Sequence, residues 1–330
     1  MRSHMSEPSV ALVESRALTR TFKVGHGASA ARVNAVDAVD LQIRAGETLA
    51  LVGESGCGKT TLGRMLALLM QPSAGQLLIR DQDAAGLSRR QLKPLRRHVQ
   101  MVFQDPVSSL NPRHPVETIL SEPLQNFDLY PGPERRERVL EMMEAVGLAP
   151  RDLQRYPHEF SGGQRQRITL ARALVLNPDF IVADEPVSAL DVSVQSQILN
   201  LLVDLRNRFS LTYLFISHDL AVVHHIDDRV AVMYLGRIVE LASRDQLFAS
   251  AGHPYTRALM ASVPEIRPGK RRIGRILPGD PPSPLSPPSG CRFHPRCAHA
   301  TEPCRQEVPP LVPMDNTGHL IACHNAEALA

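Results

Sequence analysis

Continuous apolar runs and helical repeats alternate over the first 250 residues of the chain. Residues 48–52, 180–183 and 213–216 are mainly apolar runs of the length found in buried parallel strands. Residues 61–70 and 195–208 instead repeat their apolar side chains at helical spacing. Strand and helix in alternation predict an α/β fold in which helices cover both faces of a parallel sheet.

Two other stretches depart from this alternation. Between about residues 88 and 165 the apolar pattern is helical with few strand signals, which predicts a helical subdomain inserted into the core. Residues 254–330 hold 14 of the 27 prolines, and proline at this density disfavours long helices and central strands. We therefore expect one domain over residues 10–250 and an irregular extension over residues 251–330.

Composition limits the class of protein. With 43% apolar residues the 330-residue chain can bury a sizeable core, and its formal net charge of +3 gives no electrostatic case for nucleic acid as the main ligand. No run approaches the 18 or so apolar residues of a membrane-spanning helix. Residues 1–9 open with Met-Arg-Ser-His-Met and lack an apolar run, so we expect a tag remnant and a disordered start rather than a secretory signal. These features predict a soluble, globular, intracellular protein.

A phosphate-binding loop is predicted at residues 53–60. The sequence Gly-Glu-Ser-Gly-Cys-Gly-Lys-Thr fits the P-loop pattern G-x-x-x-x-G-K-[ST] between a predicted strand and helix. In such a loop the glycines let backbone N–H groups, that of Cys57 among them, point at phosphate oxygens, and the helix N-terminus adds partial positive charge. Lys59 would reach the β- and γ-phosphates, and Thr60 would offer its hydroxyl to Mg²⁺. The alternative is a glycine-rich turn that carries a lysine by chance, and the flanking strand and helix argue against it.

Polar residues follow two of the predicted strands. Asp184 and Glu185 come after the run 180–183, and His218 comes after the run 213–216. Because the carboxyl ends of parallel strands meet at one edge, we expect Asp184 in the Mg²⁺ shell, Glu185 polarising the attacking water and His218 in reach of a γ-phosphate. Taken singly, such carboxylates often cap a helix and a lone histidine is usually structural. Their convergence on one phosphate site favours the catalytic interpretation.

A second anion-binding helix start is predicted at residues 161–164. Ser-Gly-Gly-Gln precedes the apolar-periodic residues 168–176, and it offers a capping serine and exposed N–H groups. Ser-Gly-Gly-Gln between a P-loop and an Asp-Glu strand resembles the signature of the ABC ATPase family. The signature normally begins with leucine, and Phe160 stands in that place here. This departure leaves the phosphate contacts of the motif intact.

The resemblance covers residues 10–250 and comprises six motifs in order. It implies a P-loop NTPase core of the RecA type, an antiparallel β portion at the N-terminus and an inserted helical signature subdomain. It also makes Phe22 the aromatic residue that stacks on adenine, Gln104 the Q-loop residue and Asp191 the D-loop aspartate. The implied set is Phe22, Gly53, Ser55, Gly56, Cys57, Gly58, Lys59, Thr60 and Thr61 for ATP; Thr60, Gln104 and Asp184 for Mg²⁺; Glu185 and His218 for catalysis; and Ser161, Gly162, Gly163 and Gln164 for the ATP of a partner subunit.

Members of this family form composite sites, in which ATP on the P-loop of one subunit is closed over by the signature of another. The chain has one P-loop and one signature, so the resemblance implies a second ATPase chain. The gap of roughly a hundred residues between the two motifs has no heptads, which argues against the DNA-repair and chromosome-organising members with their long coiled coil. Ribosome-associated members normally carry two ATPase cassettes in one chain, whereas this chain has one, which argues against that class as well. A nucleic-acid-binding tail is disfavoured by few aromatics and mixed charge.

Further segments resemble the dipeptide/oligopeptide importer subfamily. They are residues 104–106 with 109–112, 253–256, 278–282 and 287–297. The resemblance implies ATP-driven peptide import by a heterodimer of ATPases, two separate permease subunits and an extracytoplasmic peptide-binding protein. It places the chain at the cytoplasmic face of a bacterial inner membrane. Nickel importers share this extension, so an importer of nickel or another small solute is the alternative.

The extension contains four of the five cysteines, Cys291, Cys297, Cys304 and Cys323. The cytosolic location that ATP requires disfavours disulfides, and the spacings lack the tight C-x₂₋₄-C pairs of a structural zinc site. Four thiolates on irregular loops suit an iron–sulfur cluster, and relatives with this extension carry one. We therefore expect a [4Fe–4S] cluster that shapes the extension. The alternatives are Zn²⁺, free thiols and disulfides formed during purification.

Overall fold

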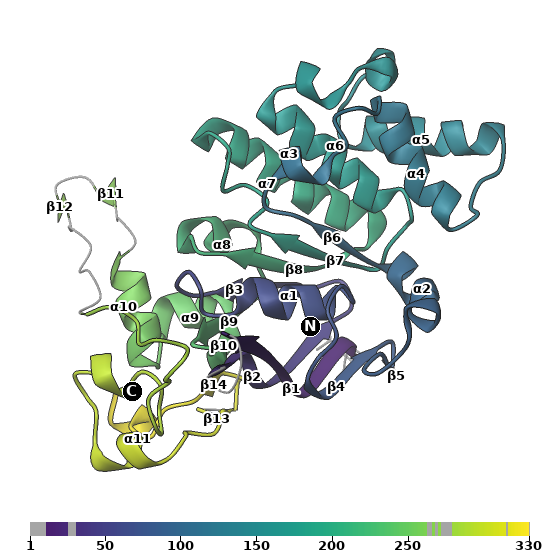
Figure 1. Ribbon diagram of the computed structural model, residues 1–330. Coiled ribbons are helices and arrows are strands. Elements are labelled where there is room, and N and C mark those ends of the chain that lie inside the picture. Colours follow the sequence, from purple (N-terminus) through teal and green to yellow (C-terminus); the bar gives the residue numbers. More distant parts are fainter. Residues whose placement is uncertain are drawn as a thin grey trace, which may run out of the picture.

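Two β-sheets with a helix between them form the centre of the molecule (Figure 1). The computed structural model describes residues 11–25, 31–262, 266–267, 270–271, 279–314 and 316–329. The tag remnant and disordered start expected at residues 1–9 lie outside the described residues. Helix α1 (Lys59–Leu66) packs between the sheets through Leu62, Met65 and Leu66.

The larger sheet has a parallel centre, as the apolar runs predict. Strand β3 is buried along its whole length and pairs in parallel with β8 and β9, and β7 pairs in parallel with β8 and β6. Runs buried on both faces are typical of such strands. The order in the sheet is β13 (Val312–Pro313), β14 (Leu320–Ile321), β10 (Arg237–Ser243), β9 (Arg229–Tyr234), β3 (Thr48–Val52), β8 (Thr212–Ser217), β7 (Phe180–Asp184) and β6 (Val99–Val102).

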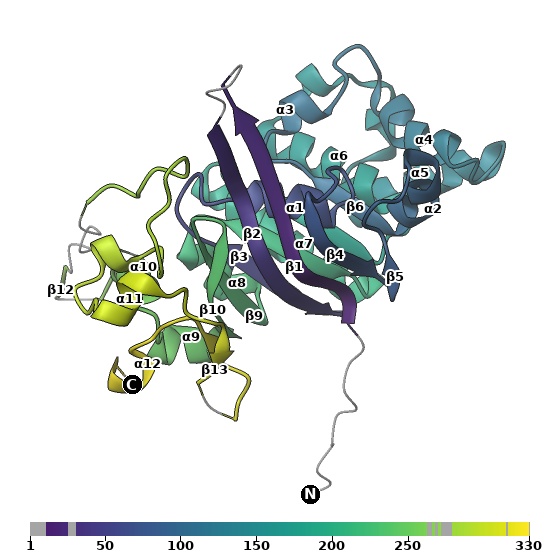
Figure 2. The same ribbon diagram turned by 60° about the horizontal axis from the view of Figure 1, so that its bottom comes forward.

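The smaller sheet is antiparallel, as the family resemblance implies for the N-terminal portion. Strand β1 lies between β2 and β4 and pairs antiparallel with both. Its inward side chains, Val13 and Leu18 among them, join the apolar core around α1. Figure 2 shows the long β1–β2 pair crossing the front of the molecule. The strands are β2 (Ala31–Arg44), β1 (Ala11–Val24), β4 (Ala74–Ile79) and β5 (Gln82–Asp83), in that order.

Helices cover the other face of the parallel strands. Along β7, Ile181 and Ala183 face this helical layer, while Phe180 and Val182 face α1. The segment between residues 88 and 165 is mainly helical, but strand β6 interrupts it and joins the sheet beside β7. Helix α2 (Arg89–His98) packs instead on the α1 side, through Leu92 and Leu95. The other elements are α3 (Pro106–Ser109), α4 (Val116–Asn126), α5 (Pro133–Ala145), η2 (Pro150–Gln154), η3 (Pro157–Glu159), α6 (Gly162–Leu174), α7 (Val192–Phe209) and α8 (Leu220–Ile226).

The C-terminal segment has short elements, as its proline content predicts, yet it is joined to the sheet. Strand β14 pairs antiparallel with β10 and thereby adds an edge to the large sheet. In Figure 2 the segment lies beside β9 and β10, on the side away from α4 and α5. None of the described helices has the length and apolar character needed to cross a membrane. The elements are α9 (Arg244–Ser250), α10 (Pro254–Ser262), β11 (Ile266–Arg267), β12 (Lys270–Arg271), η4 (His294–Arg296), α11 (Glu302–Gln306) and α12 (Ala326–Leu329).

Candidate functional site

The predicted P-loop runs from β3 into α1, and two of its glycines are required by space. Gly53 and Gly58 have φ of 152° and 111°, which favour glycine. A Cβ on Gly53 would lie 2.2 Å from the carbonyl oxygen of Met233, and one on Gly58 would lie 2.1 Å from that of Ala35. The loop is therefore pressed between β9 and β2. Ser55 and Gly56 at its tip are exposed, as a phosphate-binding loop requires.

Lys59 is held inside its own loop. Its ammonium group donates to the carbonyl oxygens of Gly53 at 2.7 Å and Glu54 at 3.0 Å, and the residue is 5% exposed. Cys57 is buried beside it, and burial raises the pKa of that thiol. A lysine so placed needs only to exchange these carbonyls for phosphate oxygens when a nucleotide enters the loop. Thr61, which follows in α1, is half-buried.

A hydroxyl and a carboxylate meet at the start of α1. Thr60 donates through Oγ1 to Oδ1 of Asp184 at 3.1 Å, although 124 residues separate them in the sequence. Burial at the end of β7 raises the pKa of Asp184, because the low dielectric disfavours its charged form. A hydroxyl and a buried carboxylate beside a P-loop are oxygen donors that suit Mg²⁺. The residues present thus fit the ion that the sequence predicts here.

Two further side chains contact the next residue, Glu185. Gln104 donates to Oε2 of Glu185 at 2.9 Å, and Nδ1 of His218 lies 3.0 Å from Oε1. Glu185 has φ of 47°, a left-handed conformation that residues other than glycine rarely adopt. Strand ends β6, β7 and β8 supply these groups, so the predicted meeting of strand-end side chains at one edge is what the structure shows. Such an arrangement can orient and polarise a water molecule.

The signature residues lie on the opposite face of the sheet from α1. Ser161 caps α6 by accepting from the backbone N–H of Gln164, whose side chain accepts from the N–H of Ser161 in return. Gly162 and Gly163 approach Leu190 and Val194, next to the D-loop. Asp191 is the N-cap residue of α7 and is exposed. In Figure 1 the start of α6 belongs to the helical layer and not to the layer that holds the P-loop.

Phe22 lies near the end of β1, opposite Val33 of β2. Ala35, two residues along β2, is the residue whose carbonyl touches Gly58. The hairpin therefore brings Phe22 to the side of the sheet where the P-loop lies. The guanidinium of Arg20 lies 4.9 Å from the centre of its ring, so a base stacking on Phe22 would share the ring with this cation.

The C-terminal segment also reaches the P-loop, a contact that no sequence pattern predicts. The backbone N–H of Glu54 donates to the hydroxyl of Tyr255 at 2.8 Å, and Arg296 makes a two-pronged ion pair with the carboxylate of Glu54. Residues 253–256 and 287–297 were identified only as segments that resemble the importer subfamily, and no contact with the P-loop was predicted for them. A buried arginine beside a P-loop acid has no sequence signal, because 242 residues separate the two.

The four cysteines of the extension are gathered in one region. The backbone N–H of Cys291 donates to the carbonyl of Cys304 at 2.9 Å. The pKa of the Cys291 thiol is raised to about 11, first by burial and then by the thiols of Cys304, Cys323 and Cys297. All five cysteines of the chain are unpaired. In the described part of the chain, no three His, Cys, Asp or Glu side chains are arranged to hold a metal ion, so the expected [4Fe–4S] ligand set is not preformed.

Two family models match the sequence. Residues 36–188 match the ABC transporter model, and residues 239–304 match that of the oligopeptide/dipeptide transporter C-terminal region. The second match includes Cys291, Cys297 and Cys304 but ends before Cys323.

Curated relatives resemble nearly the whole chain. It is 53% identical over 319 residues to a probable peptide ABC transporter ATP-binding protein, y4tS, of Sinorhizobium fredii, covering 96% of this chain and 90% of that protein. It is 51% identical to the di/tripeptide transport ATP-binding protein DppF of Pseudomonas aeruginosa, covering 96% and 98%. It is 52% identical to the oligopeptide transport ATP-binding protein AppF of Bacillus subtilis, covering 88% and 89%.

Solved structures resemble about 70% of the chain. The ATP-binding cassette MJ0796, in a dimeric post-hydrolysis state bound to ADP and Pi, superposes with a TM-score of 0.62 at 30% identity, covering 70% of this chain and 98% of that one. The cbiO1 protein of Clostridium perfringens, part of the complex cbiONQ, gives a TM-score of 0.65 at 28% identity, covering 73% and 91%.

Proposed function

This chain belongs to the ABC transporter family of ATP-binding proteins, and from that premise we propose that it hydrolyses ATP to power the import of dipeptides or oligopeptides. The observation that carries the proposal is the convergence at one sheet edge. Thr60 of the P-loop contacts Asp184, Lys59 lies buried in the same loop, and Gln104 and His218 contact Glu185. Relatives named for peptide transport, similar over nearly the whole chain, support the substrate class.

The chemistry of the proposed site follows from its side chains. Thr60, Asp184 and Gln104 would hold Mg²⁺, which supplies positive charge to the phosphate oxygens when bound. Lys59 and the backbone N–H groups of the loop bind and orient the phosphates. Glu185 accepts a hydrogen bond from the attacking water and draws its proton as the bond to phosphorus forms. His218, 58% exposed in its side chain, can turn from Glu185 toward a γ-phosphate.

A second chain completes the proposed site. The signature residues 161–164 lie on the other face of the sheet from this chain's α1, so within one chain they are badly placed to close over the P-loop. The dimer of the similar cassette MJ0796 supports such an assembly. We propose a heterodimer with a second ATPase, bound to two permease subunits and served by an extracytoplasmic peptide-binding protein. This places the chain at the cytoplasmic face of the membrane, on the permeases.

We also propose the domain limits. The ATPase domain spans residues 10–250 and contains a helical subdomain at about 88–165, and the extension spans residues 251–330.

The cysteines of the extension remain a proposed metal site. We propose that Cys291, Cys297, Cys304 and Cys323 together hold one centre, since the thiols of Cys304, Cys323 and Cys297 contribute to the raised pKa of Cys291. Thiol-only donors suit an iron–sulfur cluster or Zn²⁺. We propose that this group has a structural role, separate from ATP hydrolysis.

Transport in cells tests the proposal. Cells lacking this chain but retaining its partner subunits are supplied with the wild-type chain or with Lys59→Ala, and uptake of a labelled dipeptide, a labelled longer peptide and labelled Ni²⁺ is measured. We expect peptide uptake with the wild-type chain and none with Lys59→Ala. Uptake of Ni²⁺ alone would identify the nickel importer instead. Full uptake of peptides with Lys59→Ala would contradict the proposed role of the P-loop.

A further inference from the structure

Glu54, the second residue of the P-loop, is held from two directions by the C-terminal segment. Its backbone N–H donates to the hydroxyl of Tyr255 in α10 at 2.8 Å. Its carboxylate accepts from both terminal nitrogens of Arg296 in η4, at 2.8 Å and 3.1 Å. A two-pronged arginine–carboxylate pair fixes direction as well as distance. These three residues are called the Glu54 clamp below.

Both partners of Glu54 are themselves immobilised. Tyr255 is fully buried, and its ring packs against Tyr234 and Phe293 with centroid distances of 4.6 Å and 5.4 Å. The side chain of Arg296 is only 5% exposed, and it also contacts the hydroxyl of Tyr234 at 3.4 Å. The clamp is therefore anchored in an apolar cluster that joins β9 to the C-terminal segment.

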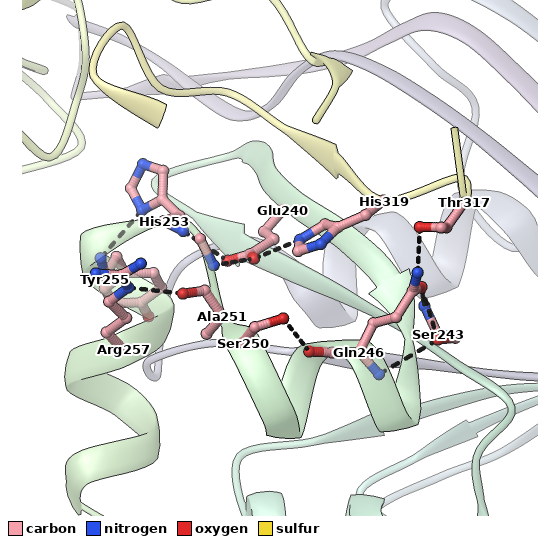
Figure 3. Close-up of polar contacts among 11 residues, drawn as sticks. Glu240, Ser243, Gln246, Ser250, Ala251, His253, Tyr255, Arg257, Thr317 and His319 are labelled. Atoms are coloured by element: carbon pink, nitrogen blue, oxygen red, sulfur yellow. Dashed lines mark hydrogen bonds and ion pairs between the residues drawn. The ribbon is translucent and has the colours of Figure 1, made fainter. Parts of the chain in front are cut away.

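The start of α10 is fixed by a buried carboxylate of the core. Glu240 in β10 accepts from the backbone N–H groups of Gly252 and His253 at 2.6 Å and 3.0 Å, and from His319 at 2.7 Å. The ring of His253 in turn accepts from the backbone N–H of Tyr255 at 3.0 Å. Figure 3 shows this line of contacts from His319 through Glu240 and His253 to Tyr255. The position of Tyr255 is thus determined by the docking of the C-terminal segment.

The peptide unit that is hydrogen-bonded to Tyr255 is also hydrogen-bonded to the P-loop lysine, Lys59. The N–H of Glu54 and the C=O of Gly53 belong to the same planar unit. Tyr255 binds its N–H end, and Lys59 donates to its C=O end at 2.7 Å. Lys59 also donates to the carbonyl of Glu54 itself. Fixing this peptide therefore fixes the place from which Lys59 meets a phosphate.

We propose that Tyr255 and Arg296 are positioning residues for ATP, and that the docked C-terminal segment sets the affinity of the P-loop through Glu54. This rests on the proposed function only in that the P-loop binds ATP. A loop held in one conformation loses less freedom when the nucleotide binds, so the clamp favours binding. The groups around Glu185 belong to other strand ends and are not touched by the clamp.

Equilibrium titration of the purified full-length chain with a fluorescent ATP analogue and Mg²⁺ tests this. We expect Arg296→Ala and Tyr255→Phe each to raise the Kd by roughly tenfold, about what one lost charged or well-placed hydrogen bond gives, with Arg296→Lys intermediate. In the background of Glu54→Ala, Arg296→Ala should have no further effect. In the assembled transporter, KM for ATP should rise while kcat at saturating ATP stays unchanged.

Arg292→Ala is the matched control. Arg292 lies in the same segment and pairs with Asp37 of β2, with side chains 12% and 14% exposed, but it does not contact Glu54. This variant removes one contact of the segment with β2 but leaves the Glu54 clamp and the Glu240 contacts in place, so the Kd should stay within twofold. An equal rise in Kd for Arg292→Ala, an unchanged Kd for both clamp variants, or full additivity of Arg296→Ala with Glu54→Ala would each overturn the proposal. If Arg296→Ala does not fold, Tyr255→Phe and Arg296→Lys decide the question. Failure of the wild-type chain to bind ATP would instead refute the proposed function.

Discussion

Nδ1 of His218 lies 3.0 Å from Oε1 of Glu185, and the two residues directly follow neighbouring parallel strands, β8 and β7. The other carboxylate oxygen of Glu185 accepts from Gln104 at 2.9 Å. With both oxygens engaged and its backbone in a left-handed conformation, Glu185 is held in one defined direction. Orientation of this kind is what a general base requires of its surroundings.

Glu185→Gln is expected to lower kcat by about 10²–10⁴-fold while ATP binding is retained. The amide keeps an oxygen that can accept from Gln104 but cannot take a proton from water. The measurement is phosphate release by the assembled transporter, with ATP affinity of the purified chain as the control. Turnover close to that of the wild-type protein would remove Glu185 from this role.

Replacement of Gly162 by glutamate is expected to abolish hydrolysis at the ATP site of the partner. A Cβ there would meet only the flexible end of Leu190 at 3.3 Å, and an acid in the first turn of α6 does not harm the helix. Its charge would instead repel a phosphate. In the double variant Gly162→Glu with Glu185→Gln, hydrolysis at this chain's own site is also removed. Any phosphate release that remains therefore comes from the partner's site alone. Loss of ATP binding to this chain's own P-loop would contradict the composite site.

Much of the core could be predicted because burial leaves a direct record in the sequence. Strand β3 coincides with the predicted run 48–52. Strand β7 is one residue longer than the run 180–183, and β8 is one residue longer than the run 213–216 at each end. The first helix was predicted over 61–70 but spans Lys59–Leu66. It starts early because the last glycine of the P-loop caps it, and it ends early because Leu68 has φ of 58°. Apolar periodicity carries neither signal.

The links between the extension and the core could not be predicted. Strands β13 and β14 have two residues each, too few for any periodicity to appear. The contacts of Glu54 with Tyr255 and Arg296 join residues more than 200 positions apart. Pairings at that separation are set by how the fold closes, and a single sequence holds no trace of them.

The metal content of the protein decides the role of the extension cysteines. Protein purified without oxygen is expected to absorb broadly near about 400 nm and to carry about four irons per chain. Cys304→Ser, at the most buried of the four thiols, should abolish the absorption and expose the extension to proteolysis. Cys57→Ser, outside the group, should leave the metal content unchanged. A content of one zinc and no iron per chain would identify the site as a Zn²⁺ site instead of a cluster, and the absence of both metals would contradict a metal site.

The free energy of unfolding is expected to decrease as the pH is lowered below about 6.5, because of His253. Burial lowers the pKa of this imidazole to about 4, with Glu240 opposing the shift. The unfolded chain takes up a proton near pH 6.5 and the folded chain does not, so stability is complete above that pH and is lost as pH falls toward 4. At pH 5 the loss is about 2 kcal/mol, since one pKa unit corresponds to about 1.4 kcal/mol.

His253→Asn isolates this contribution. Its amide oxygen can replace Nδ1 as the acceptor for the backbone N–H of Tyr255, and it does not titrate. Denaturant unfolding at pH 7.5 and pH 5 should show a smaller pH difference for the variant by about 2 kcal/mol. Asp227, a fully buried acid, acts in the opposite direction, because burial raises its pKa and the folded state gains stability as it protonates. That term is common to both proteins and cancels in the comparison. Equal pH differences for the two proteins would show that His253 is not held neutral.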